Sequence, residues 1–220
     1  MTEPSATQAR VGRPRQTEGA ADVREQLLDA AIRLATERGI DATSIRAIAD
    51  EAGVTPGMIS YYFGGKQGLS EAMIDRVYER IVARVRAFLD EPEAGDPLTG
   101  LVQFQVATFA SAPWLPQLVV REVLAKDGPL RKFFIARIAS GPATLVPALL
   151  RREMASGRIR DDLDPALTML SLMGMLVFPF LAYPVLHDVL GYEIDQDFRD
   201  RLTAHTCAIV ERGLAPEGAS

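Results

Sequence analysis

Residues 30–69 read AAIRLATERGIDATSIRAIADEAGVTPGMISYYFGGKQGL, and this stretch decides the fold of the chain. Apolar residues recur in it at helical spacing, and the glycines that interrupt them are suited to end helices. Together with the residues just before it, the stretch predicts helices over residues 22–38, 44–52 and 55–63. Three short helices joined by tight turns favour a helix-turn-helix unit, whose last helix lies in the major groove of DNA.

The turn before the third helix is Ala52-Gly53-Val54. Glycine readily adopts the left-handed backbone conformation that a tight turn between helices needs, and Val54 is placed to fill the angle between them. Thr55 is expected to cap the third helix, with Pro56 at its first position. Two residues of this helix, Ile59 and Phe63, are expected to face inward, and four are expected to face outward: Gly57, Met58, Ser60 and Tyr61.

The third helix lies in a stretch without acidic side chains, which runs from residue 52 to residue 70 and contains Lys66 at the start of a long fourth helix. Free N–H groups at helix starts, hydroxyl groups and a lysine suit a surface that faces phosphate. The whole chain has a net charge of −5, and residues 1–90 carry 12 basic against 13 acidic side chains. DNA binding must therefore depend on local arrangement, and we expect a shallow dependence of affinity on salt.

The same stretch resembles the N-terminal domain of TetR-family transcriptional regulators. The residues that carry the resemblance are Ala30, Ala31, Leu34, Glu37, Gly39, Thr43, Ile48, Ala49, Ala52, Gly53, Val54, Gly57, Tyr61, Phe63, Lys66 and Leu69. The resemblance implies an all-α fold: an N-terminal three-helix helix-turn-helix DNA-binding domain, followed by a larger helical domain that binds an effector and forms a dimer. Two positions depart from the family, because Ala35 stands where many members carry an aromatic residue and Ser60 where many carry tyrosine.

The candidate DNA-binding residues come from the second, third and fourth helices. Thr43 or Ser44 can cap the second helix. The resemblance implies that Thr43 caps it and also donates to a phosphate, although a plain cap is the simpler role. Arg46 and Lys66 are placed to contact phosphates, with an ordinary solvated charge as the alternative for Arg46. Tyr61 and Tyr62 point about 100° apart on a helix, so one of them is nearly as well suited to packing as to DNA contact. The full set is Thr43, Arg46, Thr55, Gly57, Met58, Ser60, Tyr61, Tyr62 and Lys66.

Beyond a linker at residues 91–97 the pattern stays helical, and no segment shows the alternation of a bounded strand. The expected helices follow the long helix from Lys66 and cover residues 98–111, 115–126, 129–156, 164–186 and 195–213. We expect three parts: a mobile N-terminal arm over residues 1–21, a DNA-binding domain over 22–66, and an effector-binding and dimerisation domain over 67–220.

The helical body is rich in aromatic and methionine residues, which suits a largely apolar pocket with a few polar groups. The candidate lining residues are Phe104, Gln105, Thr108, Phe109, Trp114, Arg121, Phe134, Met169 and Met173. For each of them, plain core packing is the simpler alternative.

Residues 165–186, PALTMLSLMGMLVFPFLAYPVL, contain no charged side chain and are long enough for a membrane span. Two internal prolines and the lack of a basic flank argue against a span. A helix that is apolar all round also suits a subunit interface, and residues 157–165 are similar to the turn that opens the family's dimer-forming helix. We therefore expect a homodimer formed through helices 164–186 and 195–213, and no membrane partner.

The composition argues against several other classes of protein. One cysteine and two histidines in 220 residues exclude a disulfide framework and a multi-cysteine zinc site, and leave little for a Ser-His-Asp triad. No nucleotide-binding loop is present. We expect no enzymatic activity, no cofactor and no metal, and, from the polar N-terminus, a cytoplasmic protein. The arginines of the arm, Arg10, Arg13 and Arg15, resemble part of a minor-groove hook, although an unstructured charged tail is the simpler interpretation.

These observations predict a homodimeric transcriptional regulator, most simply a repressor, that binds a palindromic operator on double-stranded DNA. A small, largely apolar effector of unknown identity is expected to release it. The alternative is an effector-independent helix-turn-helix protein with an architectural or cell-cycle role.

Overall fold

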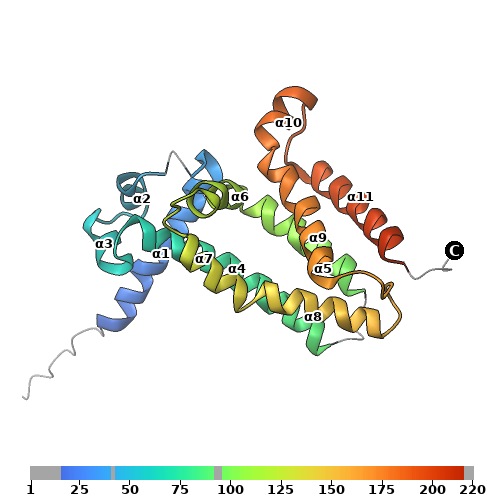
Figure 1. The fold of residues 1–220 in the computed structure, drawn as a ribbon. Helices are drawn as coiled ribbons and strands as arrows, with labels where there is room; N and C mark the ends of the chain where they lie inside the picture. Colours follow the sequence, from blue (N-terminus) through green and yellow to red (C-terminus); the bar gives the residue numbers. More distant parts are fainter. Residues whose placement is uncertain (1–15, 41–42, 92–95, 216–220) are drawn as a thin grey trace, which may run out of the picture.

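The computed structural model describes residues 16–40, 43–91 and 96–215, and every regular element in these ranges is helical, as the sequence predicts. The helices are α1 (Gln16–Arg38), α2 (Ile45–Glu51), α3 (Gly57–Phe63), α4 (Lys66–Asp90), α5 (Pro97–Ser111), α6 (Trp114–Val119), α7 (Arg131–Ala139), α8 (Pro142–Ala155), α9 (Pro165–Leu181), α10 (Tyr183–Leu190) and α11 (Gln196–Leu214). A π-helical turn, η1 (Val120–Leu124), follows α6 directly. Figure 1 shows α1, α2 and α3 gathered at one end of α4, with α5, α8, α9 and α11 toward the other.

The helix-turn-helix end has an apolar core to which each of its four helices contributes one face. The inward side chains recur every three or four residues, as helix geometry requires. They include Leu27, Ala30, Ala31 and Leu34 of α1, Ile48 and Ala49 of α2, Ile59 of α3, and Leu69 and Met73 of α4, all of them buried. Burying each leucine or isoleucine contributes about 1.5–3 kcal/mol. On the surface, Arg76 of α4 forms ion pairs with both Glu25 and Asp29 of α1.

Helix α4 belongs to both ends of the molecule because its 25 residues form one uninterrupted helix. It packs against α1 and α3 at the helix-turn-helix end, and against α5, α7 and α8 in the body. Its buried stripe includes Leu69, Met73, Val77, Ile81 and Val85. The expected domain boundary after residue 66 therefore falls at the first residue of a helix that both parts share.

The body is built around α5, α8, α9 and α11, which pack on one another. Trp114, at the start of α6, and Phe180, near the end of α9, are each only 1% exposed. The Phe180 ring centroid lies 5.8 Å from that of Phe109 and 6.4 Å from that of Phe198. These aromatic contacts join α5, α9 and α11 into one core.

Some helix boundaries differ from the sequence-based expectation. Helix α1 begins at Gln16, so residues 16–21 of the expected mobile arm are helical. The three arginines of the arm lie outside the described residues. The expected helix over 115–126 is α6 followed by the π-helical turn η1, a form that hydrophobic spacing does not distinguish from an α-helix.

Two long helices expected in the body are each broken in two. The one over 129–156 separates into α7 and α8 at Gly141, which adopts φ −141° and ψ −106°, just before Pro142. The one over 164–186 ends at Leu181, and α10 leaves α9 at an angle of 61°. Proline lacks the N–H that would continue a helix and restricts the residue before it, which accounts for a break at Pro142 and one just before Pro184.

Two stretches are long and apolar enough to cross a membrane when length and composition alone are considered: Arg131–Ala155 and the pair α9–α10. The first contains the break between α7 and α8, and the second contains the 61° bend. The same composition is typical of helices in a protein core or a subunit interface.

Candidate nucleic-acid interface

Ser44 fixes the start of α2. Its side chain accepts a hydrogen bond from the backbone N–H of Ala47 at 3.1 Å, which satisfies one of the free N–H groups of the first turn. Thr43 is instead buried, with 2% of its surface exposed, and its hydroxyl donates to the carbonyl of Gly39 at 2.9 Å. The expectation that Thr43 caps α2 is therefore wrong, because the end of α1 engages its hydroxyl.

The turn between α2 and α3 has the predicted form. Gly53 adopts a φ of +67°, and the N–H of Val54 donates to the carbonyl of Ala49 at 3.0 Å. This arrangement closes α2 and redirects the chain into α3. Ile59 of α3 is fully buried, so it anchors the short helix on the core of the helix-turn-helix end.

Helix α3 begins two residues later than expected. Pro56 occupies the N-cap position and provides no side-chain hydrogen bond, and the carbonyl of Thr55 accepts from the N–H of Met58 at 3.0 Å. The expectation that the Thr55 side chain caps this helix is therefore wrong. Its hydroxyl lies on an exposed residue at the edge of α3.

Helix α3 exposes the face that the sequence assigns to DNA. Tyr61 is 77% exposed, and Gly57 and Ser60 are exposed beside it. Met58 and Tyr62 are half-buried, and the ring of Tyr62 meets that of Tyr61 edge-on, with centroids 4.9 Å apart. A protruding tyrosine between a glycine and hydroxyl groups allows close approach to base edges and phosphates.

Three basic side chains lie on helices that pack next to α3. Arg46 is 87% exposed on its side chain, and its Nε lies 4.0 Å from a carboxylate oxygen of Asp50, which is a weak surface ion pair. Lys66 is exposed at the first residue of α4, where the helix dipole also favours anions. Arg24 of α1 places its guanidinium 5.0 Å from the ring centroid of Phe63, at the end of α3. The helices next to α3 thus each contribute one of these basic side chains, of which Arg24 also forms an ion pair with Glu25 at 3.2 Å.

The sequence offers Thr43 and Ser44 as alternative caps of the second helix, and the structure selects Ser44. One residue beside α3, Arg24, was missed by the sequence reasoning. Arg24 gave no local signal, because its neighbour Phe63 is far away in the sequence and only the packing of α1 against the other helices brings them together.

Comparison with known proteins agrees with this geometry. Residues 27–73 match the family described as bacterial regulatory proteins, tetR family. Over 148 aligned residues the chain is 30% identical to the HTH-type transcriptional repressor KstR2 of Mycolicibacterium smegmatis. The aligned region covers 66% of this chain and 71% of KstR2. The chain belongs to the TetR family. It is therefore a DNA-binding transcriptional regulator, as its relatives are.

Solved structures of TetR-like regulators share the fold along nearly the whole chain. The fatty acid degradation regulator FadR of Bacillus halodurans has a TM-score of 0.67 and 22% identity, covering 87% of this chain and 96% of that one. FadR of Bacillus subtilis, solved in complex with stearoyl-CoA, has a TM-score of 0.62 and 18% identity, covering 87% and 99%. Identities this low establish the fold alone, which is a helix-turn-helix end followed by a larger helical body.

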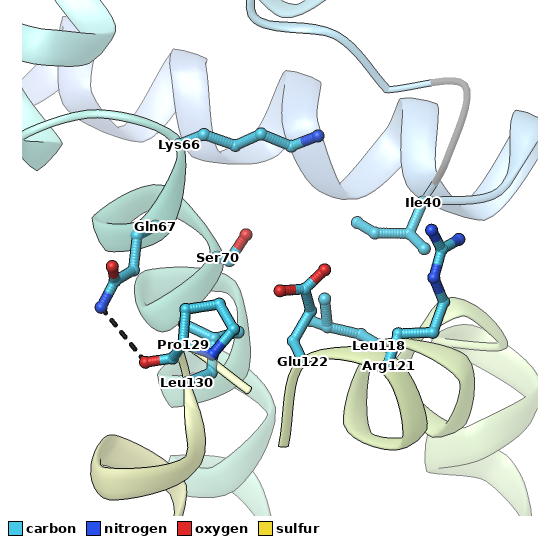
Figure 2. Close-up of a pocket in the computed structure, with 9 residues that line it drawn as sticks. All are labelled: Ile40, Lys66, Gln67, Ser70, Leu118, Arg121, Glu122, Pro129 and Leu130. Carbon is cyan, nitrogen blue, oxygen red and sulfur yellow. Dashed lines mark hydrogen bonds between the residues drawn. The ribbon is translucent and has the colours of Figure 1, made fainter. Parts of the chain in front are cut away.

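The residues expected to line an effector pocket lie in three places. Seven of them lie on α9 or on α5 and α6, each of which packs against α9: Phe104, Gln105, Thr108, Phe109, Trp114, Met169 and Met173. Phe134 lies apart from this group, on α7, with its ring centroid 5.6 Å from that of Tyr78 on α4. Burial at this contact raises the pKa of the Tyr78 phenol. Arg121 lines a cavity between the helix-turn-helix end and the body (Figure 2).

Two of the candidate lining residues, on α5 and α6, carry buried polar atoms without a partner in the described part of the chain. The amide oxygen of Gln105 and the indole nitrogen of Trp114 are buried and have no hydrogen-bond partner among the described residues. Buried polar atoms are normally paired, so these two mark places for a water molecule or a ligand. In the part of the chain that the structure describes, no three His, Cys, Asp or Glu side chains gather as metal ligands.

Proposed function

We propose that this chain is a repressor that binds a palindromic operator as a homodimer and leaves it when a small, largely apolar effector binds. The exposed face of α3, with Tyr61 77% exposed beside Gly57 and Ser60, is the observation that carries the proposal. One α3 helix from each subunit occupies a major groove, so that the half-sites lie about one helical turn apart. The protein acts in the cytoplasm, on double-stranded DNA.

Every candidate DNA-binding residue except Thr43 has a role in this proposal. Thr55, Gly57, Met58 and Ser60 approach base edges, and Met58 suits a thymine methyl group. Tyr61, Tyr62, Arg46 and Lys66 contact the sugar-phosphate backbone, which fixes the register of the helix. Thr43 has no part in it, because its buried hydroxyl already donates to Gly39. We assign residues 22–66 to DNA binding and 67–220 to effector binding and dimerisation, joined through α4.

The homodimer is supported by an apolar surface on α9, α10 and α11. The exposed apolar side chains there are Leu167, Leu170 and Phe178 of α9, Val185, Val189 and Leu190 of α10, and Ile209 of α11. A surface of this kind suits an interface between two copies of the chain. Its position agrees with the helices that the sequence assigned to dimerisation.

The effector is supported by the polar atoms of Gln105 and Trp114, which lie unpartnered in an aromatic core. A largely apolar molecule with a hydrogen-bond donor and an acceptor would satisfy both. The complex of the Bacillus subtilis FadR with stearoyl-CoA shows a relative of the same fold with an amphipathic ligand. Binding that changes the spacing of the two helix-turn-helix ends would weaken operator binding through a coupling of about 1–3 kcal/mol.

A DNA-binding assay with matched variants tests the proposal. The operator is first identified by genome-wide recovery of bound DNA from the native organism. In a gel-shift assay on that operator, we expect the double variant Lys66→Ala with Tyr62→Ala to bind at least about tenfold more weakly, because two backbone contacts are lost. Lys132→Ala, which removes an exposed lysine on α7, is the control and should bind normally. Unchanged binding by the double variant would remove the assigned phosphate contacts.

A further inference from the structure

Helix α10 is not held in place by a buried apolar face. None of its eight residues is buried, and among the helices it packs mainly on α9, from which it departs at 61°. Figure 1 shows it beyond the end of α9, at the edge of the body. Yet α10 carries three of the exposed apolar side chains assigned to the subunit interface, Val185, Val189 and Leu190. The orientation of α10 therefore decides how this part of the interface is presented.

A group of polar side chains joins α10 to the segment before α11. This α10 polar cluster consists of Tyr183, His187 and Asp188 of α10 and Glu193 of the segment. The two ring nitrogens of His187 each lie 3.0 Å from a carboxylate oxygen, Nδ1 from one of Asp188 and Nε2 from one of Glu193. The other oxygen of Glu193 accepts from the hydroxyl of Tyr183, also at 3.0 Å. Glu193 thus contacts two residues that lie one turn apart on α10.

The segment that carries Glu193 is itself attached to α11. The ring centroid of Tyr192 lies 5.8 Å from that of Phe198, whose ring meets that of Phe180 in the core of the body. The guanidinium carbon of Arg201 lies 5.7 Å from the Tyr192 ring centroid. Glu193 is therefore held by its neighbour at a defined place, and its contacts with α10 fix that helix relative to α11.

The two carboxylates suit a protonated His187. Neutral imidazole has one N–H and can donate to one of the two oxygens, whereas imidazolium donates to both. The hydrogen bonds to Asp188 and Glu193 accordingly raise the pKa of His187 above its ordinary value of about 6.5. Helix α9, on which α10 packs, has no titratable side chain, so the charges that face His187 are those of the two carboxylates. The phenol of Tyr183 stays protonated, because partial burial and the contact with Glu193 raise its pKa.

We propose that the α10 polar cluster is a proton-dependent contact that orients α10 and thereby controls the association of two copies of this chain. When His187 is protonated, it donates to Glu193 and holds α10 against the segment before α11. When His187 is neutral, one of its two contacts lacks a proton, and two carboxylates remain without the cation between them. Helix α10 then no longer presents its apolar residues in one fixed orientation. The inference rests on the homodimer of the proposed function and not on its effector or operator.

The sign of the pH dependence follows from the direction of the pKa shift. Because the native pKa of His187 is raised, the contact is complete below about pH 6.5 and is lost as the pH rises through the raised value. The His187 side chain is 45% exposed, so each ion pair is weak and screened by salt. A two-fold dimer contains the contact twice, however, which doubles its effect on association. We expect the Kd of the dimer to rise about fivefold or more between about pH 5.5 and about pH 8.5.

The contact itself is tested by NMR on the full chain. The ring signals of both histidines and the backbone amide signals of α10 are followed over this pH range. We expect His187 to titrate above about pH 6.5, and the signals of Val185 and Val189 to shift with the same midpoint. Glu193→Gln removes one carboxylate charge, so it should lower this midpoint, whereas Glu37→Gln on α1 should not. Titration of His187 without any response of α10 would overturn the proposal.

Sedimentation equilibrium then measures association as a function of pH. His187→Gln should associate more weakly than the wild type in acid, and its Kd should not depend on pH. His205→Gln, the matched change at the other histidine of the chain, should keep the wild-type pH dependence. A wild-type Kd that is constant with pH, or a pH dependence that survives in His187→Gln, would overturn the control of association. A chain that is monomeric at every pH would instead overturn the homodimer, and the NMR titration would still decide whether the cluster orients α10.

Discussion

The contact between α3 and α4 leaves no room for a side chain at Gly68. A Cβ atom built there would lie 1.9 Å from the carbonyl oxygen of Phe63, the last residue of α3. The absence of a side chain therefore sets how α3, the helix proposed to face DNA, is held against the first turns of α4. Because backbone cannot rotate away as a flexible side chain can, any substitution must move one helix against the other.

Gly68→Ala should therefore lower both stability and operator affinity. We expect the free energy of unfolding to fall by about 1–3 kcal/mol, as for other overpacked positions, measured by urea denaturation. Gly213→Ala is the matched control, because its Cβ would meet nothing within 4 Å and alanine favours a helix by up to about 1 kcal/mol. Equal effects of the two substitutions would show that the contact with Phe63 is not limiting.

Side-chain roles were predictable from the sequence where they depend on neighbours in the chain. Gly53, Ile59 and the exposed face of α3 follow from helical spacing and turn chemistry alone. Thr43 was misplaced because two adjacent hydroxyl residues can each cap a helix, and only the position of the Gly39 carbonyl decides between them. Arg121 was expected to line the effector pocket in the body, but η1 places it at the cavity between the helix-turn-helix end and the body.

Among the helices, the end of α8 is joined to α4 by a buried carboxylate. Glu153 is 1% exposed and accepts hydrogen bonds from Arg152 at 2.9 Å and from Arg158 at 3.0 Å. Arg152 also donates to the carbonyls of Phe88 and Leu89, at 2.7 and 3.0 Å, and so satisfies the C-terminal end of α4. One carboxylate thus orients two arginines, one of which closes a second helix.

Glu153→Gln should destabilise the fold, because it leaves both arginines without their anion. We expect a loss of about 1–3 kcal/mol in urea denaturation, below the value for a fully buried pair because Arg158 is half exposed. Burial raises the pKa of Glu153, but the hydrogen bonds from Arg158 and Arg152 together outweigh it and lower the pKa. The carboxylate therefore stabilises the native state fully above the ordinary pKa of about 4.3, and this stability is lost as the pH falls through the lower native value.

The variant should accordingly differ most from the wild type near neutral pH, and the two should converge in acid. Glu37→Gln, which changes an exposed carboxylate on α1, serves as the control and should keep the wild-type pH dependence. A constant difference between Glu153→Gln and wild type from pH 7 down to pH 3 would contradict the assignment.

Helix content was predictable because the apolar spacing is continuous, but helix continuity was not. The pair Gly141-Pro142 carried a signal for a break, yet apolar residues on both sides keep the same period. The direction in which α10 leaves α9 depends on packing in the body rather than on local sequence, so the 61° bend had no counterpart in the pattern.

For the complete chain, association through α9–α11 should be required for tight operator binding. Phe178→Asp places a charge at a residue that is 62% exposed on the proposed interface, so we expect monomers in sedimentation and a large loss of operator affinity. Ile135→Asp makes the same change on α7, at a residue 56% exposed outside that interface. Dissociation by both substitutions, or by neither, would argue against the assigned surface.

The charge of the chain makes a separate prediction about salt. With 24 basic against 29 acidic side chains and a net charge of −5, the protein has no overall positive field to add to the contacts made by α3. A plot of the logarithm of operator affinity against that of salt concentration should have a slope smaller in magnitude than about 9, the value for ten neutralised phosphates. Fluorescence anisotropy at several sodium chloride concentrations measures it. A steeper slope would mean that further cations, such as those of residues 1–15, reach the DNA.

The unbroken course of α4 has a geometric consequence for control of DNA binding. At 1.5 Å per residue, its 25 residues form a rod about 37 Å long. If the body end is the pivot, a rotation of only about 5° carries Lys66 through an arc of about 3 Å. In the proposed symmetric homodimer the two arcs run in opposite directions, so the separation of the two α3 helices would change by about 6 Å, against a helical repeat of DNA of about 34 Å. In that homodimer, a small rearrangement of side chains deep in the body would be enlarged into a mismatch between the protein and its operator.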